Sequence, residues 1–447
     1  MAEYKRKKVQ KKKLHEPKHI KKTVNRSKVE QQNIKMHSTK RVKNTAKPIS
    51  SSKPVKKTAN KPKNPQIFKN FKVLQGFKKK RTLKTTIVGA VSIVVIITFL
   101  IIALCAPVNI FEATGNLLAS IGSSSYPLSL SGGVTIDVKT SKNLIYILSD
   151  THIDIINSSG KHIKSIQHGF ENPAISISEG RSIVYDIGST GYMIFNPSGT
   201  ALNDKTEKEI ICAEISRSGM FAIATKSATH TSEVNVINKD GANKYTWYCS
   251  GGTITNIALS SNGKKLAVGI LSTENGAFKS KVNIMGYKSA SAISTYEYDG
   301  IIYSLDTISS SRFCVTTSQT TDYCSFNGKS RKVFDYDYPV SSLKSEYSNY
   351  LAVDSRRVGD KSDNNIYILN TRGKQKYKVN YSGTMTDFYV KGNYIYFLGN
   401  SEIVKMNRKG NIVSKAPCSF SALKIVGSKN GALIITDNSV DFIKFEN

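Results

Sequence analysis

Short runs of Ile, Val and Tyr alternate with clusters of Gly, Asn and Ser from residue 126 to residue 447. Most runs have four to seven residues, which is the length of a strand and too short for an ordinary helix. The breaks between them contain the residues that favour tight turns. Residues 126–447 are therefore predicted to form an all-β domain.

Two turn patterns recur along this segment. The first is Asn-x-x-Gly, which stands at 157–160, 196–199, 238–241, 370–373 and 407–410. The second is a Ser followed by a short turn and a strand of small apolar residues, as at 216–224, 260–268 and 345–353. In the first pattern, the Asn side chain is expected to cap the turn. The Gly is expected to take the left-handed conformation.

Aligned on these turns, the chain divides into repeats of about 41 residues with four short strands each. Such a period indicates a β-propeller. The repeats begin near Val134, Ala174, Ile211, Ile254, Ile302, Val340, Thr384 and Ser421. We expect eight blades, or seven if the irregular unit 174–208 is not a complete blade. The last unit has room for three strands, so residues 126–130 are predicted to supply its outer strand and remove an exposed edge.

A second kind of hydrophobic segment precedes this domain. Residues 87–106 contain no charge, and twenty residues in a helix span about 30 Å, the thickness of a bilayer core. We predict a transmembrane helix at 86–106. A cleaved signal peptide is a poor alternative, because the apolar run is long and 86 residues precede it. A basic cluster immediately precedes the helix and no comparable cluster follows it, which predicts a single-pass plasma-membrane protein with a cytoplasmic N-terminus and an external C-terminal domain.

Charge is distributed unevenly around that segment. The chain has a net charge of +33, but residues 1–84 hold 29 Lys and Arg against 3 acidic residues. Residues 107–447 hold 36 against 29. A uniformly basic nucleic-acid-binding domain is therefore excluded, and a nucleic-acid partner is not expected.

The basic N-terminal part divides further by its apolar content. Residues 1–66 have few apolar groups and are predicted to be a disordered cytoplasmic tail. Residues 67–84 have apolar residues at helical spacing and are predicted to be an amphipathic juxtamembrane segment, followed beyond the membrane by a linker at 107–125. Anionic inner-leaflet lipids are the expected partner, although a solvated tail that only sets orientation explains the same charge. The residues expected at the membrane surface are Lys78, Lys79, Lys80, Arg81 and Lys84.

Candidate catalytic chemistry is sparse in the predicted propeller. The sequence has neither a nucleophile elbow nor a phosphate-binding loop, and we predict no catalytic, cofactor-binding or metal-ligating residue. Asp150, Asp186 and Asp306 lie near strand ends, where they are either turn residues or paired carboxylates of a glycan-processing site. His152 and His162 lack ligand spacing and are interpreted as structural or surface residues.

Aromatic residues gather on the predicted outermost strands. They are either packing between blades or a partner-binding rim, in which Tyr and Trp are favoured. The residues concerned are Tyr245, Trp247, Tyr296, Tyr298, Phe334, Tyr336 and Tyr338. Five cysteines follow the apolar segment; Cys314 and Cys324 stand on successive predicted strands, where they would either face each other or be buried free thiols.

Several motifs resemble known propellers. The paired strands resemble WD40-like repeats and the Asn-x-x-Gly-Lys turns resemble quinoprotein-type repeats, although the Trp-Asp and blade-docking Trp signatures are missing. The segments 148–151, 157–161, 167–173 and 185–188 are similar to an uncharacterised domain-of-unknown-function family of Gram-positive bacteria, whose members pair one transmembrane helix with a propeller. That resemblance implies an architecture and no activity. Its signature residues here are Asp150, Gln167, His168, Pro173, Tyr185, Asp186 and Gly188.

These observations favour a membrane-anchored external propeller that acts as a non-enzymatic binding or scaffold module at the cell envelope. Its partner would be an envelope protein or polymer, and no cofactor is implied. The alternative is an envelope glycan-processing enzyme with its site at the mouth of the propeller channel. A third hypothesis assigns the function to the basic tail.

Overall fold

The structure is a computed structural model that describes residues 93, 122–123, 125–346, 350–428 and 430–445. The predicted tail at 1–66, juxtamembrane segment at 67–84 and transmembrane helix at 86–106 lie outside these residues, except for Ile93, which is helical. Most of the predicted linker at 107–125 lies outside them as well. None of the helical structure that is described has the length and apolar character needed to cross a membrane.

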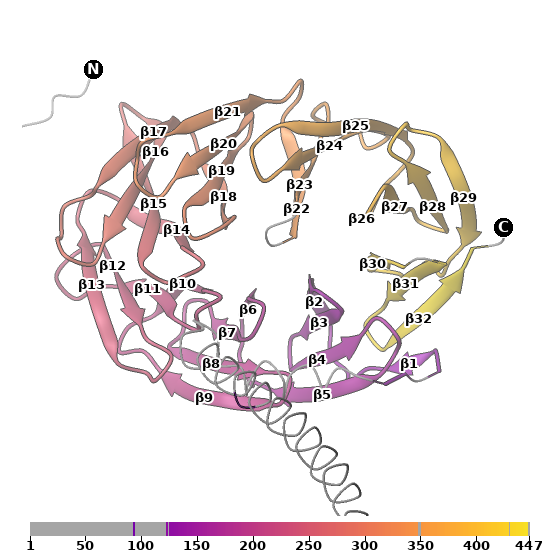
Figure 1. The fold of residues 1–447 in the computed structure, drawn as a ribbon, viewed down its shortest axis with the longest axis horizontal. Coiled ribbons are helices and arrows are strands. Elements are labelled where there is room, and N and C mark those ends of the chain that lie inside the picture. The colour runs from indigo at the N-terminus through magenta and orange to yellow at the C-terminus, as the bar shows by residue number, and fades with distance from the viewer. Residues whose placement is uncertain (1–92, 94–121, 124, 347–349, 429, 446–447) are drawn as a thin grey trace, which may run out of the picture. The chain divides into compact units, whose positions relative to one another are not determined.

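The described part of 122–445 is a ring of eight four-stranded antiparallel sheets (Figure 1). Each sheet is one blade, with its first strand at the centre of the ring and its last strand at the circumference. The all-β prediction and the count of eight blades are therefore confirmed. The irregular repeat at 174–208 is a complete blade formed by β6 to β9, which excludes the seven-bladed alternative.

The strands follow the predicted repeats closely. Blades 1 and 2 consist of β2 (Thr135–Ser141), β3 (Leu144–Ser149), β4 (His152–Asn157) and β5 (His162–Gln167), then β6 (Pro173–Ile177), β7 (Ser182–Asp186), β8 (Gly191–Asn196) and β9 (Gly199–Lys205). Blades 3 and 4 consist of β10 (Ile210–Ile215), β11 (Phe221–Lys226), β12 (Ser232–Ile237) and β13 (Asn243–Cys249), then β14 (Thr253–Leu259), β15 (Lys265–Glu274), β16 (Ala277–Gly286) and β17 (Ser294–Asp299).

The second half of the ring is built in the same way. Blades 5 and 6 consist of β18 (Ile302–Thr307), β19 (Arg312–Thr317), β20 (Thr320–Ser325) and β21 (Arg331–Asp335), then β22 (Val340–Glu346), β23 (Tyr350–Ser355), β24 (Asp363–Asn370) and β25 (Gln375–Ser382). Blades 7 and 8 consist of β26 (Asp387–Lys391), β27 (Tyr394–Leu398), β28 (Glu402–Asn407) and β29 (Ile412–Pro417), then β30 (Lys424–Gly427), β31 (Gly431–Ile435), β32 (Ser439–Lys444) and the early strand β1 (Leu128–Ser129).

The ring closes where β1 pairs with β32. Leu128 lies opposite Val440, and Ser129 lies opposite Ser439, so the first strand of the domain completes the last blade as predicted. The ring of Tyr126 stacks on Phe442 with centroids 5.8 Å apart, which adds apolar contact to the short ladder. Closure covers the outer edge of β32 and gives blade 8 four strands, like the other blades.

Apolar side chains fill the space between every pair of neighbouring blades. The cluster between blades 1 and 2, for example, contains Leu148 and Ile153 from one blade and Val184 and Phe195 from the next, all fully buried. The cluster between blades 8 and 1 is formed in the same way and extends the closure. Because both faces of each sheet are buried, the central strands have continuous apolar runs rather than strict alternation.

The blades share one orientation, which gives the ring two distinct faces. The proximal face carries the turns between the first and second and between the third and fourth strands of each blade. The chain joins the ring on this face, since the Gly122 carbonyl accepts a hydrogen bond from Asn157 Nδ2 (2.8 Å) in one of those turns. The distal face carries the remaining turns and the connections between blades.

All five Asn-x-x-Gly turns on the proximal face have the predicted Asn cap, and four of their glycines have the predicted positive φ; Gly199, the first residue of β9, does not. Asn157 Oδ1 accepts backbone hydrogen bonds from Ser159 and Lys161, both at 2.9 Å, and Gly160 has a φ of 81°. Asn370 caps its own turn in the same way, and Gly373 has a φ of 68°. A side-chain cap and a left-handed glycine therefore close the outer hairpins of blades 1, 3, 6 and 7.

Candidate functional site

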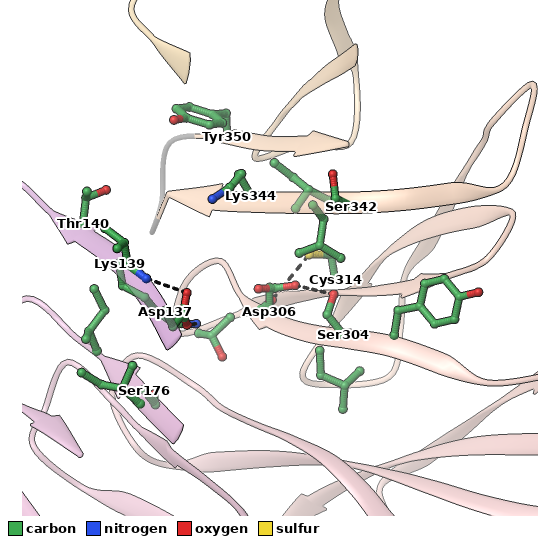
Figure 2. A pocket seen from close by; sticks show the side chains of 18 of the residues that line it. Asp137, Lys139, Thr140, Ser176, Ser304, Asp306, Cys314, Ser342, Lys344 and Tyr350 are labelled. Carbon is green, nitrogen blue, oxygen red and sulfur yellow. Dashed lines mark hydrogen bonds and ion pairs between the residues drawn. The ribbon is translucent and has the colours of Figure 1, made fainter. Parts of the chain in front are cut away.

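The innermost strands surround a central cavity of about 650 Å³. Figure 2 shows side chains from β2, β18 and β22 converging on it, with Lys139, Asp306 and Lys344 among them. An innermost strand has a sheet neighbour on one side only. Its side chains therefore meet the open axis of the ring and can be polar without cost to the core.

A shared irregularity sets which residues point into this cavity. The innermost strands of blades 1, 3, 5 and 6 each have a register shift after their first residue, and that of blade 4 has one after its second residue. Counting from that bulge, Lys139, Glu214, Asp306 and Lys344 occupy the same position in four blades. The repeat thus places charged side chains at one level of the cavity wall.

Several of these charges are paired within the cavity. Lys344 Nζ lies 2.8 Å from Asp387 Oδ1, and the other oxygen of Asp387 accepts a hydrogen bond from the backbone N–H of Ile425 (3.0 Å). Lys139 Nζ lies 3.6 Å from Asp137 Oδ2 on its own strand. The wall is therefore a mixed-charge surface, which suits a polar ligand better than an apolar one.

Glu214 has the most unusual environment in the cavity wall. Ser176 Oγ donates to its Oε2 at 2.8 Å, from the neighbouring blade. Burial raises the pKa of Glu214 to about 7, with Asp306 adding to the rise and Ser176 and Lys139 opposing it. Glu214 can therefore exchange a proton near neutral pH.

Large apolar side chains stand exposed in turns and connections of the distal face. Val358 is 90 % exposed in a turn of blade 6, and Phe420 is 83 % exposed in the connection to blade 8. Contiguous apolar patches on a protein surface mark interaction sites, whereas apolar residues exposed singly are normal. The distal apolar group consists of Val134, Ile136, Ile301, Tyr303, Val358 and Phe420.

The predicted aromatic rim lies between blades. Trp247 Nε1 donates to the Ala290 carbonyl of the next blade (2.9 Å), and Tyr245 OH donates to the Ser289 carbonyl (2.9 Å). Tyr296 OH donates in the same way to the Ser330 carbonyl (3.2 Å). These contacts fit the packing interpretation, and the partner-binding interpretation stays a prediction.

The remaining aromatic residues of that group are held similarly. Tyr298 is buried beneath the guanidinium of Arg331, 4.8 Å from its ring centroid. Tyr336 is also buried and packs against Phe334, while Tyr338 is half-buried and accepts a hydrogen bond from Arg357 (3.1 Å). Little of these rings is left to face a partner.

The acidic family-signature residues hold distal loops. Asp150 Oδ1 accepts the backbone N–H of Val134 (2.9 Å), and Asp186 Oδ1 accepts that of Asn172 (2.8 Å). They stand at turns of different blades. Of the three carboxylates considered for glycan chemistry, only Asp306 lines the cavity.

Of the other signature residues, Gln167, His168 and Pro173 lie at the connection between blades 1 and 2, whereas Tyr185 and Gly188 lie on β7 and in the turn that follows it. His168 is held at both nitrogens: Nε2 donates to the Ser149 carbonyl and Nδ1 accepts the N–H of Phe170, both at 3.1 Å. Gly188 has a φ of 81°, and its N–H donates to the Ile210 carbonyl (2.9 Å), which explains the glycine. Gln167 is exposed, whereas Pro173 and Tyr185 are buried.

The histidines and cysteines of the described ring are widely dispersed. His162 Nε2 lies 2.9 Å from the buried Asp154, and His152 contacts its neighbour Thr151. Within the described residues, no group of three or more His, Cys, Asp and Glu could hold a metal ion. All five described cysteines are free. Cys324 lies opposite Phe313 in the ladder, so Cys314, one residue further, points to the other side of the sheet.

Sequence reasoning did not identify Glu214, Lys139, Lys344 or Asp387 as cavity residues. A signal was present, because a polar residue recurs near the middle of the first strand of most repeats. These residues can be aligned between repeats only when the β-bulge is known, because the bulge shifts the position along the strand by one residue. Composition does not reveal a bulge.

Solved structures with a similar fold were found, although none of the curated proteins matches the sequence. BamB from Moraxella catarrhalis aligns at 10 % identity with a TM-score of 0.44, over 73 % of this chain and 100 % of its own. Sqt1 from Saccharomyces cerevisiae aligns at 11 % identity with a TM-score of 0.49, over 73 % and 100 %. AztD from Citrobacter koseri aligns at 11 % identity with a TM-score of 0.44, over 63 % and 87 %.

A family model also matches the sequence. It spans residues 123–445, which is the whole of the described ring from the closing strand to the end of the last blade. The family therefore coincides with the propeller and does not extend into the basic N-terminal part. The chain belongs to the family of unknown function DUF5711.

Proposed function

We propose that this protein is a non-enzymatic binding module that displays its propeller outside the cell, anchored in the plasma membrane by residues 86–106. The basic tail at 1–66 would lie in the cytoplasm beside anionic lipids. The partner would be an envelope protein that docks on the distal face. The observation that carries this proposal is the distal apolar group.

A partner that covers the distal apolar group would gain binding free energy, because apolar surface would leave water. Burying one large aliphatic or aromatic side chain contributes about 1.5–3 kcal/mol, so several such residues on one face supply the core of a stable interface. The blades hold these side chains on short loops of a closed ring, so little conformational entropy is lost on binding. Exposed aliphatic and aromatic residues favour a protein partner over a hydrated polysaccharide.

Cross-linking in intact cells, followed by affinity recovery of the full chain, tests this proposal. The variant Val358→Asp/Phe420→Asp should lose at least tenfold of a cross-linked envelope protein. Ile412→Asp is a matched control, because Ile412 is 53 % exposed on the outermost strand of blade 7. Equal recovery from both variants would reject the distal face as the docking site. Protease shaving of intact cells checks the orientation independently, since the propeller should be cleaved and the tail retained.

A second candidate function rests on Glu214 and Asp306. A proton-donating Glu214 and a second carboxylate in one polar cavity are the groups that a glycan hydrolase or lyase requires. Hydrolysis of envelope polysaccharide by the purified chain, lost in both Glu214→Gln and Asp306→Asn, would support the enzyme. Activity that survives both substitutions, or is absent from the wild type, would exclude it.

A further inference from the structure

The proximal face of the ring is densely basic. Exposed Lys and Arg residues occupy its turns in almost every blade. Representative members, one from each of six blades, define the proximal basic face: Lys142, Lys239, Lys264, Lys329, Arg372 and Lys409.

Few carboxylates offset this charge. Among the described turn residues of the proximal face, only Glu179 and Asp240 are acidic. Glu179 is already shared by two cations, with Lys142 Nζ at 2.9 Å and Arg217 at 3.0 Å. The distal face differs, because its loops expose acids such as Asp150 and Glu171. The modest net charge of the domain is therefore the sum of a basic proximal face and a more acidic distal face.

Folding does not account for the basic residues. An Asn-x-x-Gly turn needs its Asn to cap and its Gly to take positive φ, and the positions between and after them are unconstrained. Those free positions hold Lys239, Arg372, Lys374, Arg408 and Lys409. Like charges on neighbouring turns repel each other, so their accumulation indicates an anionic partner.

The chain path indicates which anionic partner this is. Gly122 is bonded to a proximal turn, and the apolar segment 87–106 ends sixteen residues earlier in the sequence. Sixteen residues reach at most about 55 Å when fully extended. If that segment spans the bilayer, the proximal face is tethered beside the membrane surface.

We propose that the proximal basic face docks on the anionic phospholipid head groups of the leaflet that it faces. This proposal rests on the membrane anchoring proposed above. Each basic residue held at such a surface raises affinity about fivefold, and salt weakens the attraction because the screening length is about 8 Å at physiological ionic strength. Docking would fix the propeller with its distal face and cavity mouth directed away from the membrane.

Lysine footprinting of the full chain reads the two faces separately, so the basic N-terminal residues do not obscure the result. The protein is reconstituted into vesicles of phosphatidylcholine alone or with 30 % phosphatidylglycerol. It is acetylated briefly and analysed by mass spectrometry. We expect labelling of Lys239, Lys329 and Lys409 to fall at least threefold in the anionic vesicles and to recover in 0.5 M salt. Labelling of the distal Lys208 and Lys361 should not change.

A charge-reversed variant completes the test. Lys264→Glu/Arg372→Glu/Arg408→Glu should restore labelling of Lys239 and Lys329, whereas the distal control Lys208→Glu/Lys361→Glu should not. Equal labelling in both vesicle types would overturn the proposal. Protection by added polyphosphate in neutral vesicles, without protection by anionic lipid, would overturn it in favour of a soluble polyanion. Flotation of the protein with neutral vesicles reports anchoring separately, so a failure of anchoring is distinguished from a failure of docking.

Discussion

The carboxylate of Asp154 ties the connection that completes the ring to the first blade, and its removal should loosen the closure. Asp154 is 3 % exposed on β4. Its oxygens accept hydrogen bonds from Ser131 N–H (3.0 Å) and Ser131 Oγ (2.7 Å), and they contact His162 Nε2 at 2.9 Å. Ser131 lies between β1 and β2, so this carboxylate joins the closing strand to blade 1.

The magnitude follows from those contacts. A hydrogen bond to a charged group contributes about 1.5–3 kcal/mol, and Asp154→Asn keeps one acceptor oxygen while losing the charge and the other. We expect Asp154→Asn to lower the free energy of unfolding by about 2–3 kcal/mol, which corresponds to a melting temperature about 5 °C lower. Thermal unfolding followed by circular dichroism at pH 7 measures it. Asp335→Asn is the control, because Asp335 is exposed on an outermost strand.

The difference in melting temperature between the wild type and Asp154→Asn should disappear at acid pH. Burial alone would raise the pKa of Asp154, but hydrogen bonds from His162 and Ser131 outweigh it and lower the pKa below 3.8. The unfolded chain then binds the proton more readily, so the stabilisation is complete above pH 4 and is lost as the pH falls through the folded-state pKa. If Asp154→Asn and the control Asp335→Asn have the same melting temperature at pH 7, the assigned role of Asp154 is refuted.

Three further predictions concern the ring. Burial lowers the pKa of His168, so the domain should lose stability as the pH falls below about 6.5, and His168→Gln should remove that part of the pH dependence of the melting temperature. Gly373→Ala should lower the free energy of unfolding, measured with denaturant, by about 2–3 kcal/mol, because the new Cβ would lie 2.6 Å from the Tyr323 ring. Gly410 has open space around it, so Gly410→Ala should lower that free energy by about 1 kcal/mol, from its positive φ alone. Cys314 and Cys324 are buried with raised pKa values, so iodoacetamide should modify them only after unfolding, and fast modification of the native protein would contradict the packing.

The architecture could be predicted from the sequence because each blade repeats its own signals. The Asn and Gly of the proximal turns are local features, and the shortness of the last repeat implied a strand from elsewhere, which β1 supplies. The cavity could not be predicted in the same way. Glu214 and Asp306 stand 92 residues apart, and only the register of two strands in different blades brings them to one wall.

The aromatic residues show a different limit. Alternation of Tyr with acidic residues correctly indicates that the two faces of an outer strand differ. It does not show whether the aromatic face meets solvent or the next blade. Trp247 reaches a carbonyl of the next blade, a contact that depends on how far the loop at 287–293 extends. Loop conformation of this kind is set by tertiary packing, and no local pattern encodes it.

The pairing of Leu128 with Val440 has a consequence for synthesis. These residues are separated by 312 positions, so the ring remains an open arc until nearly the whole domain has been made. During that interval β1 has no partner, because β32 is the last strand to be made, and an unpaired strand edge recruits other chains. Ring completion is thus the most non-local step in folding, and such contacts form slowly. Cells that overproduce this domain should therefore accumulate multimers in which blade 8 of one copy pairs with β1 of another. A separate peptide with residues 122–131 should suppress these multimers, because it would occupy the place of β1.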